Sequence, residues 1–178
     1  MGLEWEWMEA MMSLVFDREL LSQQLGIAAT DVLETMFFTS VDLCEGEAGD
    51  SSGDPDAERI GASLDFHGAC AGRLALSLDR AAAEGLAANF FGGVGEGGPE
   101  EDSQSVMVEL TNMVCGAMLS HLDKNSIFCL DTPQQLMAGE QVSGEIVKEL
   151  TLEDGLLRLA FSLKESSARD SSGKVDAQ

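Results

Sequence analysis

The sequence predicts an α+β domain in which long helices pack on one face of an antiparallel-rich sheet. Three observations predict this class. Apolar residues alternate with a period of two in several short segments, as they do in half-buried strands. Longer segments between them have helix signals at their ends. A helix-led segment also occurs twice, which indicates pseudo-twofold symmetry.

The first half of the chain is expected to begin with a helix in two pieces over 17–39. The break is placed near Gly26, and Thr30 or Asp31 would cap the second piece. Alternating apolar residues then predict two strands over 60–66 and 74–78. The HGACAG segment between those strands provides a tight connection, so the pair is a predicted hairpin.

The next two elements are predicted helices. Asp79 is expected to cap a helix that runs to about Phe91 and ends at Gly92-Gly93. A longer helix is expected from about Ser103 to Leu122. Its sequence around Ser105–Asn112 resembles Thr30–Phe37 at an offset of 75 residues, and these two copies form the repeat.

The last part of the chain is predicted to complete the sheet. A short strand is expected at 127–130, and a hairpin is expected to pair about 142–152 with 156–164. The turn falls at Glu-Asp-Gly, residues 153–155. In the final strand the apolar side chains face one way, whereas Arg158, Ser162 and Lys164 face the other.

One domain is expected over 15–165, preceded by an acidic extension at 1–14 and followed by a disordered tail at 166–178. Two segments rich in Gly and acidic residues, 44–58 and 92–101, are expected to be exposed loops inside that domain.

Composition excludes several classes of partner. The 178 residues include 32 acidic and 10 basic side chains, and the net charge is −22. Nucleic-acid phosphates and anionic membrane surfaces would both repel such a chain, so we expect neither as a partner. A hydrophobic content of 44% provides enough apolar surface for a folded core. A soluble domain with a protein partner is therefore the expectation.

The sequence also predicts a cytoplasmic protein without a metal site of its own. No apolar run is long enough to span a bilayer, and the acidic N-terminus lacks the features of a signal peptide. The four cysteines form no CxxC pair and the two histidines have no ligand spacing, so buried free thiols are expected. These residues are Cys44, Cys70, Cys115, Cys129, His67 and His121.

A polar stripe marks the predicted long helix. Ser105, Glu109, Asn112 and Gly116 follow one another at i, i+4, i+7 and i+11, which places them in one line on the exposed face. An amide can hold a water in line for attack, and a carboxylate can anchor a cation of a partner. The alternative is an ordinary solvated face on which Gly116 serves helix packing.

The stripe resembles the signature of the CheC/CheX/FliY phosphatases, which is Asp or Ser, then Glu, then Asn, then a distant Pro. Here these residues are Ser105, Glu109, Asn112 and Pro133. ELTNMVCGAML is similar to the ELxNxxxG core of the CheX-like branch, and the preceding GRLALSLDRAAAEGLAANFFGG also resembles that branch. The resemblance covers roughly residues 25–164.

The resemblance implies a phosphatase that acts on the aspartyl phosphate of a CheY-like receiver domain. It implies that Asn112 orients the hydrolytic water and that Glu109 pairs with a receiver lysine. Ser105 would help to position Glu109 or the helix, and Pro133 would shape a flanking loop. The required Mg²⁺ belongs to the receiver, so no cofactor is expected in this chain.

The resemblance also gives the repeat a meaning. CheC and FliY relatives carry two sites, whereas CheX-like relatives carry one. In the first copy Glu34 persists and Thr30 corresponds to Ser105, but Phe37 replaces the asparagine, so this copy is expected to be a degenerate site. The resemblance further makes a homodimer through the sheet an expectation.

Two other functions remain open from the sequence. One is a non-catalytic module of the same fold that binds a receiver or another signalling protein. The other is a structural component that keeps the fold for assembly. The intact Glu109 and Asn112 pair favours catalysis, because a scaffold has no physical need for it.

Overall fold

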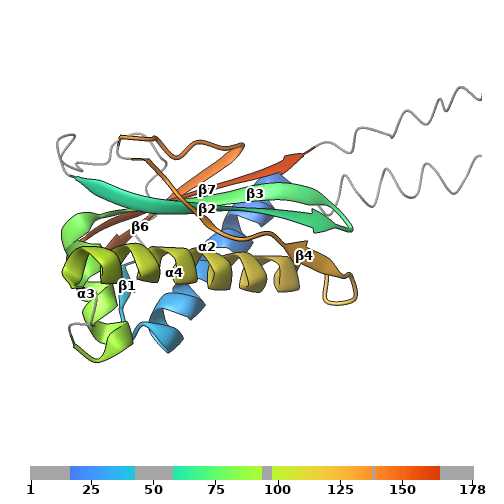
Figure 1. Ribbon diagram of the computed structural model, residues 1–178. Coiled ribbons are helices and arrows are strands. Elements are labelled where there is room, and N and C mark those ends of the chain that lie inside the picture. The colour runs from blue at the N-terminus through green and yellow to red at the C-terminus, as the bar shows by residue number, and fades with distance from the viewer. Residues whose placement is uncertain (1–16, 43–57, 94–97, 138, 165–178) are drawn as a thin grey trace, which may run out of the picture.

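The computed structural model describes residues 17–42, 58–93, 98–137 and 139–164. These residues form an antiparallel sheet with three helices on one of its faces (Figure 1). In chain order the elements are α2 (Arg18–Met36), β1 (Val41–Asp42), β2 (Arg59–Gly68), β3 (Ala71–Asp79), α3 (Arg80–Phe91), α4 (Pro99–Leu122), β4 (Phe128–Leu130), β5 (Gln134–Gln135), β6 (Ile146–Leu152) and β7 (Gly155–Lys164). The predicted fold class is confirmed.

The sheet has the strand order β1-β6-β7-β3-β2-β4, and β5 also pairs with β2. This order has a pseudo-twofold axis between β3 and β7, which exchanges β2 with β6 and β1 with β4. The short strand after each long helix therefore pairs with the hairpin of the other half of the chain. In the same exchange α2 packs against β6 and α4 packs against β2. The predicted symmetry is thus present in the topology.

The core lies between the sheet and the helices. Leucines of β2, β3 and β7 alternate onto the inner face, where cross-strand pairs such as Leu64 with Leu74 are almost fully buried. Phe66 stacks on Phe161 with ring centroids 5.6 Å apart. Burial of each such side chain stabilises the fold by roughly 1.5–3 kcal/mol relative to leaving it exposed to water. The sheet therefore provides a stable surface on which α4 packs.

Helix α2 is continuous, and the predicted break at Gly26 is wrong. Its N-cap is Asp17, whose carboxylate accepts a hydrogen bond of 3.0 Å from the Glu19 N–H. Gly26 lies where the Lys148 side chain crosses the helix, because a Cβ there would be 2.6 Å from Lys148 Cε. The glycine gives room to the neighbouring strand rather than ending the helix. Neither Thr30 nor Asp31 is a cap, because both lie inside α2.

Helix α3 has the predicted bounds, but its N-cap behaves differently. The Asp79 side chain makes no capping hydrogen bond. It instead accepts from the Leu156 N–H at 2.9 Å and pairs with Arg59 at 3.2 Å. Asp79 thus joins β3 to neighbouring strands. At the other end, Gly92 adopts φ 71°, which closes the helix as predicted.

Helix α4 begins one turn before the predicted Ser103. Pro99 occupies its first turn, where a missing N–H does no harm, and the following Glu100, Glu101 and Asp102 complement the helix dipole. Part of the expected loop at 92–101 is therefore helical, and that prediction is wrong at its C-terminal end.

The C-terminal hairpin turns at 153–155 as predicted, but β6 begins at Ile146 rather than 142. Val142 leaves the strand path and packs on the outer face of the sheet against Ala75 and Ala160. The small side chains of the two alanines make room for this crossing segment. The predicted strand at 127–130 is present as β4.

The cysteines only partly match the expectation of buried thiols. Cys115 is fully buried, and burial raises its pKa to about 12. Burial also raises the pKa of the partly buried Cys70. Cys129 is exposed, because it lies on the edge strand β4, so the prediction is wrong for this residue. Cys44 lies outside the described residues.

The expected extension at 1–14, all but the last residue of the expected loop at 44–58, and the expected tail at 166–178 lie outside the described residues. The domain bounds of 15–165 stay a prediction.

Candidate functional site

The polar stripe lies on the side of α4 that is turned away from the core. Core contacts of this helix come from the opposite side, through residues such as Val106, Leu110 and Val114. Ser105 and Glu109 are exposed, and Asn112 and Gly116 are half-buried. The structure therefore brings the four predicted residues of α4 together on one accessible line.

Gly116 does not serve helix packing. A Cβ built at this position meets no heavy atom within 4 Å, apart from its chain neighbours and the backbone of its own helix. A glycine inside a helix destabilises the fold by roughly 0.5–1 kcal/mol relative to alanine. With no packing reason for it, the open space above Gly116 suits the close approach of another molecule to the helix.

The polar groups of the stripe are free to bind a ligand. Across the described parts of the chain, no hydrogen bond or ion pair engages the side chains of Glu109 and Asn112. Ser105 makes no hydrogen bond to Glu109 in these same segments. No contact therefore supports its expected role in positioning the Glu109 carboxylate. A carboxylate acceptor and an amide lie one turn apart, both available to a partner.

Pro133 lies in a bulge beside α4. Leu130 of β4 faces Phe66 and Gln134 of β5 faces Ser63, so the edge segment has one residue more than β2 between these pairs. The extra residue falls between the two short strands, which both contact α4. Figure 1 shows β4 beside the C-terminal end of α4. A proline suits this place because it has no N–H to donate to the ladder.

The copy of the motif in the first half lies on a different helix. Glu34 is exposed on α2, whereas the Thr30 hydroxyl is buried without a hydrogen-bond partner. Phe37 follows the last helical residue and is fully buried. These three residues form no group with the stripe on α4.

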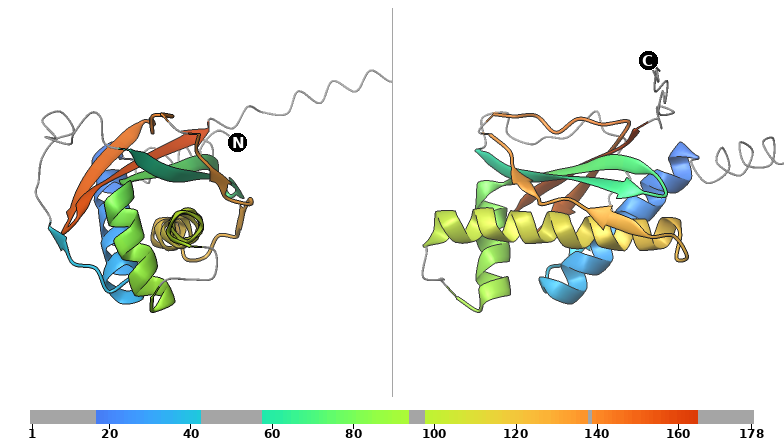
Figure 2. Two further views of the ribbon diagram at one scale, coloured as in Figure 1. Left: turned by 60° about the vertical axis from the view of Figure 1, so that its left-hand side comes forward. Right: turned by 45° about the vertical axis from the view of Figure 1, so that its right-hand side comes forward.

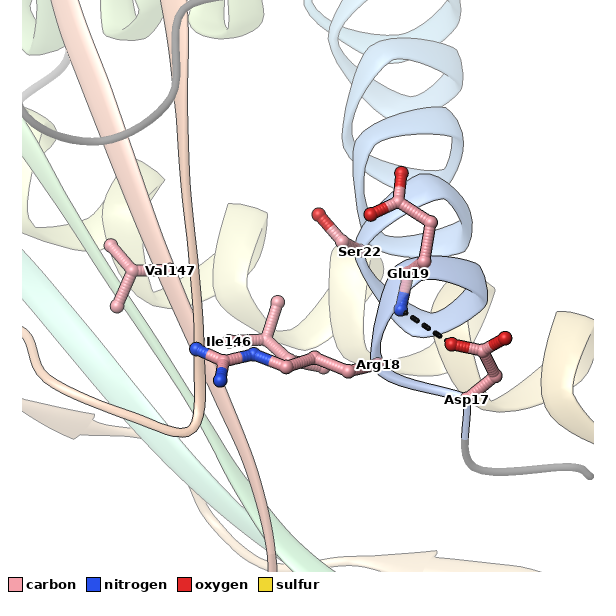
Figure 3. A pocket seen from close by; sticks show the side chains of 6 residues that line it. All are labelled: Asp17, Arg18, Glu19, Ser22, Ile146 and Val147. Carbon is pink, nitrogen blue, oxygen red and sulfur yellow. Dashed lines mark hydrogen bonds between the residues drawn. The ribbon is translucent and has the colours of Figure 1, made fainter. Parts of the chain in front are cut away.

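A shallow pocket of about 340 Å³ lies between the start of α2 and strand β6 (Figure 3). Figure 3 shows Arg18 extending across the opening toward β6, beside the capped end of α2. None of the stripe residues lines this pocket, so it is not part of the candidate site. Its lining consists of Asp17, Arg18, Glu19, Ser22, Ile146 and Val147.

The described segments lack both a metal cluster and a membrane-spanning helix. They contain no group of three His, Cys, Asp or Glu side chains that could hold a metal ion. They also contain no helix that is both long and apolar enough to cross a membrane.

The sequence reasoning missed an apolar surface at the ends of α2 and α3. Met36, Phe38, Phe90 and Phe91 are all exposed there. The available signal was the Phe-Phe pair at 37–38 and again at 90–91, each at the end of a helix. An apolar pair at a helix end that is not followed by buried structure is a candidate for an exposed patch.

Comparisons with known proteins identify a family. The model of the family described as chemotaxis phosphatase CheX matches residues 60–149, half of the chain. That range includes the whole polar stripe and Pro133. Among curated proteins, none matches the chain significantly.

Solved structures share the fold at low sequence identity. Chemotaxis protein CheX from Vibrio vulnificus has a TM-score of 0.65 at 19% identity, over 83% of this chain and 99% of that one. A CheX from Desulfovibrio desulfuricans has a TM-score of 0.62 at 18% identity, over 81% and 99%. The CheX-CheY-BeF₃-Mg²⁺ complex from Borrelia burgdorferi matches with a TM-score of 0.59 at 15% identity, over 80% and 97%.

Proposed function

Because this chain belongs to the family of chemotaxis phosphatase CheX, we propose that it accelerates hydrolysis of the aspartyl phosphate of a CheY-like receiver domain. The observation that carries the proposal is the unengaged pair of Glu109 and Asn112 on the outward side of α4. The relative from Borrelia burgdorferi, which forms a complex with CheY, supports this class of partner.

In the proposed reaction Asn112 enters the receiver's active site. Its amide can accept from and donate to a water molecule, and so hold it in line with the phosphorus atom. The water attacks phosphorus, the bond to the aspartyl oxygen breaks, and phosphate and a free carboxylate are the products. Catalysis by positioning alone is expected to add roughly 10²-fold to the receiver's own hydrolysis.

Glu109 provides the orientation of the complex. A carboxylate one turn from Asn112 can pair with the receiver lysine near the phosphate, and a charge-assisted hydrogen bond is about twice as strong as a neutral one. Gly116 lets the receiver approach the next turn of α4. Pro133 shapes the bulge that lies beside α4. The Mg²⁺ that the reaction needs is supplied by the receiver.

The test is the rate of phosphate loss from a Mg²⁺-loaded, phosphorylated receiver, with and without this protein. Asn112→Ala is expected to return the rate to that of the receiver alone, and Glu109→Gln to weaken binding of the receiver. Asn89→Ala and Glu34→Gln are matched controls, because both side chains are exposed on other helices. Equal rates for wild type and Asn112→Ala would refute the proposal.

The alternative is a non-catalytic module that binds the receiver through the same helix. It is supported if the wild type binds the phosphorylated receiver without changing its decay. A homodimer through the sheet is a separate expectation, which sedimentation of the purified protein tests.

A further inference from the structure

The described lysines and arginines are almost absent from the helical layer of the fold, whereas acidic side chains occur in both layers. Beyond the first residue of α2 and of α3, the three helices contain no lysine or arginine. The described basic side chains lie instead at those two helix starts, in the sheet and in the turn after α4. The acidic residues of the helices are Glu19, Asp31, Glu34, Glu84, Glu100, Glu101, Asp102 and Glu109. The helical layer thus carries a negative field that favours cationic partners.

An apolar surface interrupts this acidic layer. We define the aromatic patch as Met36, Phe38, Phe90 and Phe91, which are 46%, 78%, 36% and 46% exposed. Buried Phe37 forms its base, since it stacks on Phe90, and Phe90 meets Phe91 edge to face at 5.2 Å. The ends of α2 and α3 that carry the patch extend past α4 on the side away from the sheet (Figure 2).

The backbone of Phe38 has a conformation that is unfavourable for a phenylalanine. Its φ is +53°, and among the described residues no other non-glycine has a positive φ. The turn imposes this geometry, because the Phe37 and Thr39 N–H groups both donate to the Leu33 carbonyl. Glycine or asparagine would adopt this turn with less strain. A large apolar side chain that is both strained and exposed is not explained by the stability of the fold.

We propose that the aromatic patch binds a basic amphipathic helix of another protein. The apolar face of such a helix would cover the patch, and its lysines or arginines would meet the surrounding carboxylates. Glu84 is positioned for this, because it precedes Phe91 by seven residues and lies on the same side of α3. Glu34, in the last turn of α2, flanks the patch on the other helix.

Other occupants fit the charges less well. A second copy of this chain would place two acidic helical layers against each other, which is electrostatically unfavourable. The N-terminal residues 1–16 include many apolar side chains, but their charged residues are Glu4, Glu6 and Glu9, without a lysine or arginine. A basic amphipathic segment of a different protein would offer an apolar face to the patch and positive charge to the carboxylates around it.

The test uses the full chain and a fluorescent synthetic peptide with leucines on one helical face and lysines on the other. Binding is measured by anisotropy at physiological salt. Phe38→Gly relieves the strained turn, so it is expected to raise the unfolding temperature while it weakens peptide binding roughly tenfold. Phe91→Ser should also weaken binding. Ile127→Ser is the control, because Ile127 is 82% exposed in the turn after α4.

A scrambled peptide of the same composition separates patch binding from attraction by charge alone, and it should bind more weakly. Equal binding of the scrambled peptide, or unchanged binding by Phe38→Gly, would overturn the proposal. So would self-association of the wild type that Phe38→Gly abolishes, because a second copy would then occupy the patch. Asn112→Ala should retain peptide binding, which separates this test from that of the phosphatase.

Discussion

Phe37 stacks on Phe90 with their ring centroids 5.0 Å apart, at the point where α2 ends. In the internal repeat, Phe37 corresponds to Asn112 of α4. The first copy of the motif therefore differs from the second in more than the missing asparagine amide. Its helix stops one residue before that position, and the side chain there belongs to the core. The site could not be restored by changing this residue alone.

Replacement of Phe37 by Asn is expected to lower the free energy of unfolding by about 3 kcal/mol or more, because a polar group would replace a fully buried ring. Denaturant unfolding measures this, and Phe37→Leu should lose less. The double variant Asn112→Ala/Phe37→Asn should not accelerate dephosphorylation of a receiver beyond the receiver's own rate. Activity of that variant would contradict the account of the first copy.

Replacement of Gly116 by Ala is expected to stabilise the fold by about 0.5–1 kcal/mol, because the added methyl meets open space and favours the helix. Gly26→Ala is the matched control in α2, where the methyl would displace Lys148 and the gain should be smaller. Thermal unfolding measures both. Gly116→Trp should fold but lose affinity for a receiver, and unchanged affinity would show that no partner approaches this turn.

Asp79 is expected to act as an anchor between strands rather than as a helix cap. Asp79→Ala should lower the free energy of unfolding by about 1–3 kcal/mol, since it removes the acceptor for the Leu156 N–H and the partner of Arg59. Asp79→Ser would restore a cap but not the anchor, so it should not recover that loss. At Asp17, a true cap of α2, replacement by Ser should be nearly neutral.

Cys115 is expected to make the fold less stable in alkali. Burial raises the folded pKa of its thiol from 9.0 to about 12, so above about pH 9 the unfolded state releases a proton that the folded state keeps. The free energy of unfolding should therefore fall with rising pH, by up to about 1.4 kcal/mol per unit from this group. Denaturant unfolding from pH 8 to 11 should show a shallower fall for Cys115→Ala.

Local patterns in the sequence determined most of the secondary structure and the composition of the site. The period of two in the strands, the turn residues between them and the spacing of Ser105, Glu109 and Asn112 all depend on neighbours in the chain. The outward direction of the stripe follows from helical geometry, because the apolar residues of α4 occupy the other side.

Only the tertiary structure decided the features that depend on contacts distant in the chain. Gly26 leaves room inside α2 for the Lys148 side chain of β6, and the Asp79 side chain bonds to Arg59 and Leu156 instead of capping α3. The pairing of Phe37 with Phe90 and the exposure of Phe38 likewise became visible only when the helices were placed side by side. Local propensity sets which elements form, whereas packing between elements determines which side chains remain free to meet a partner.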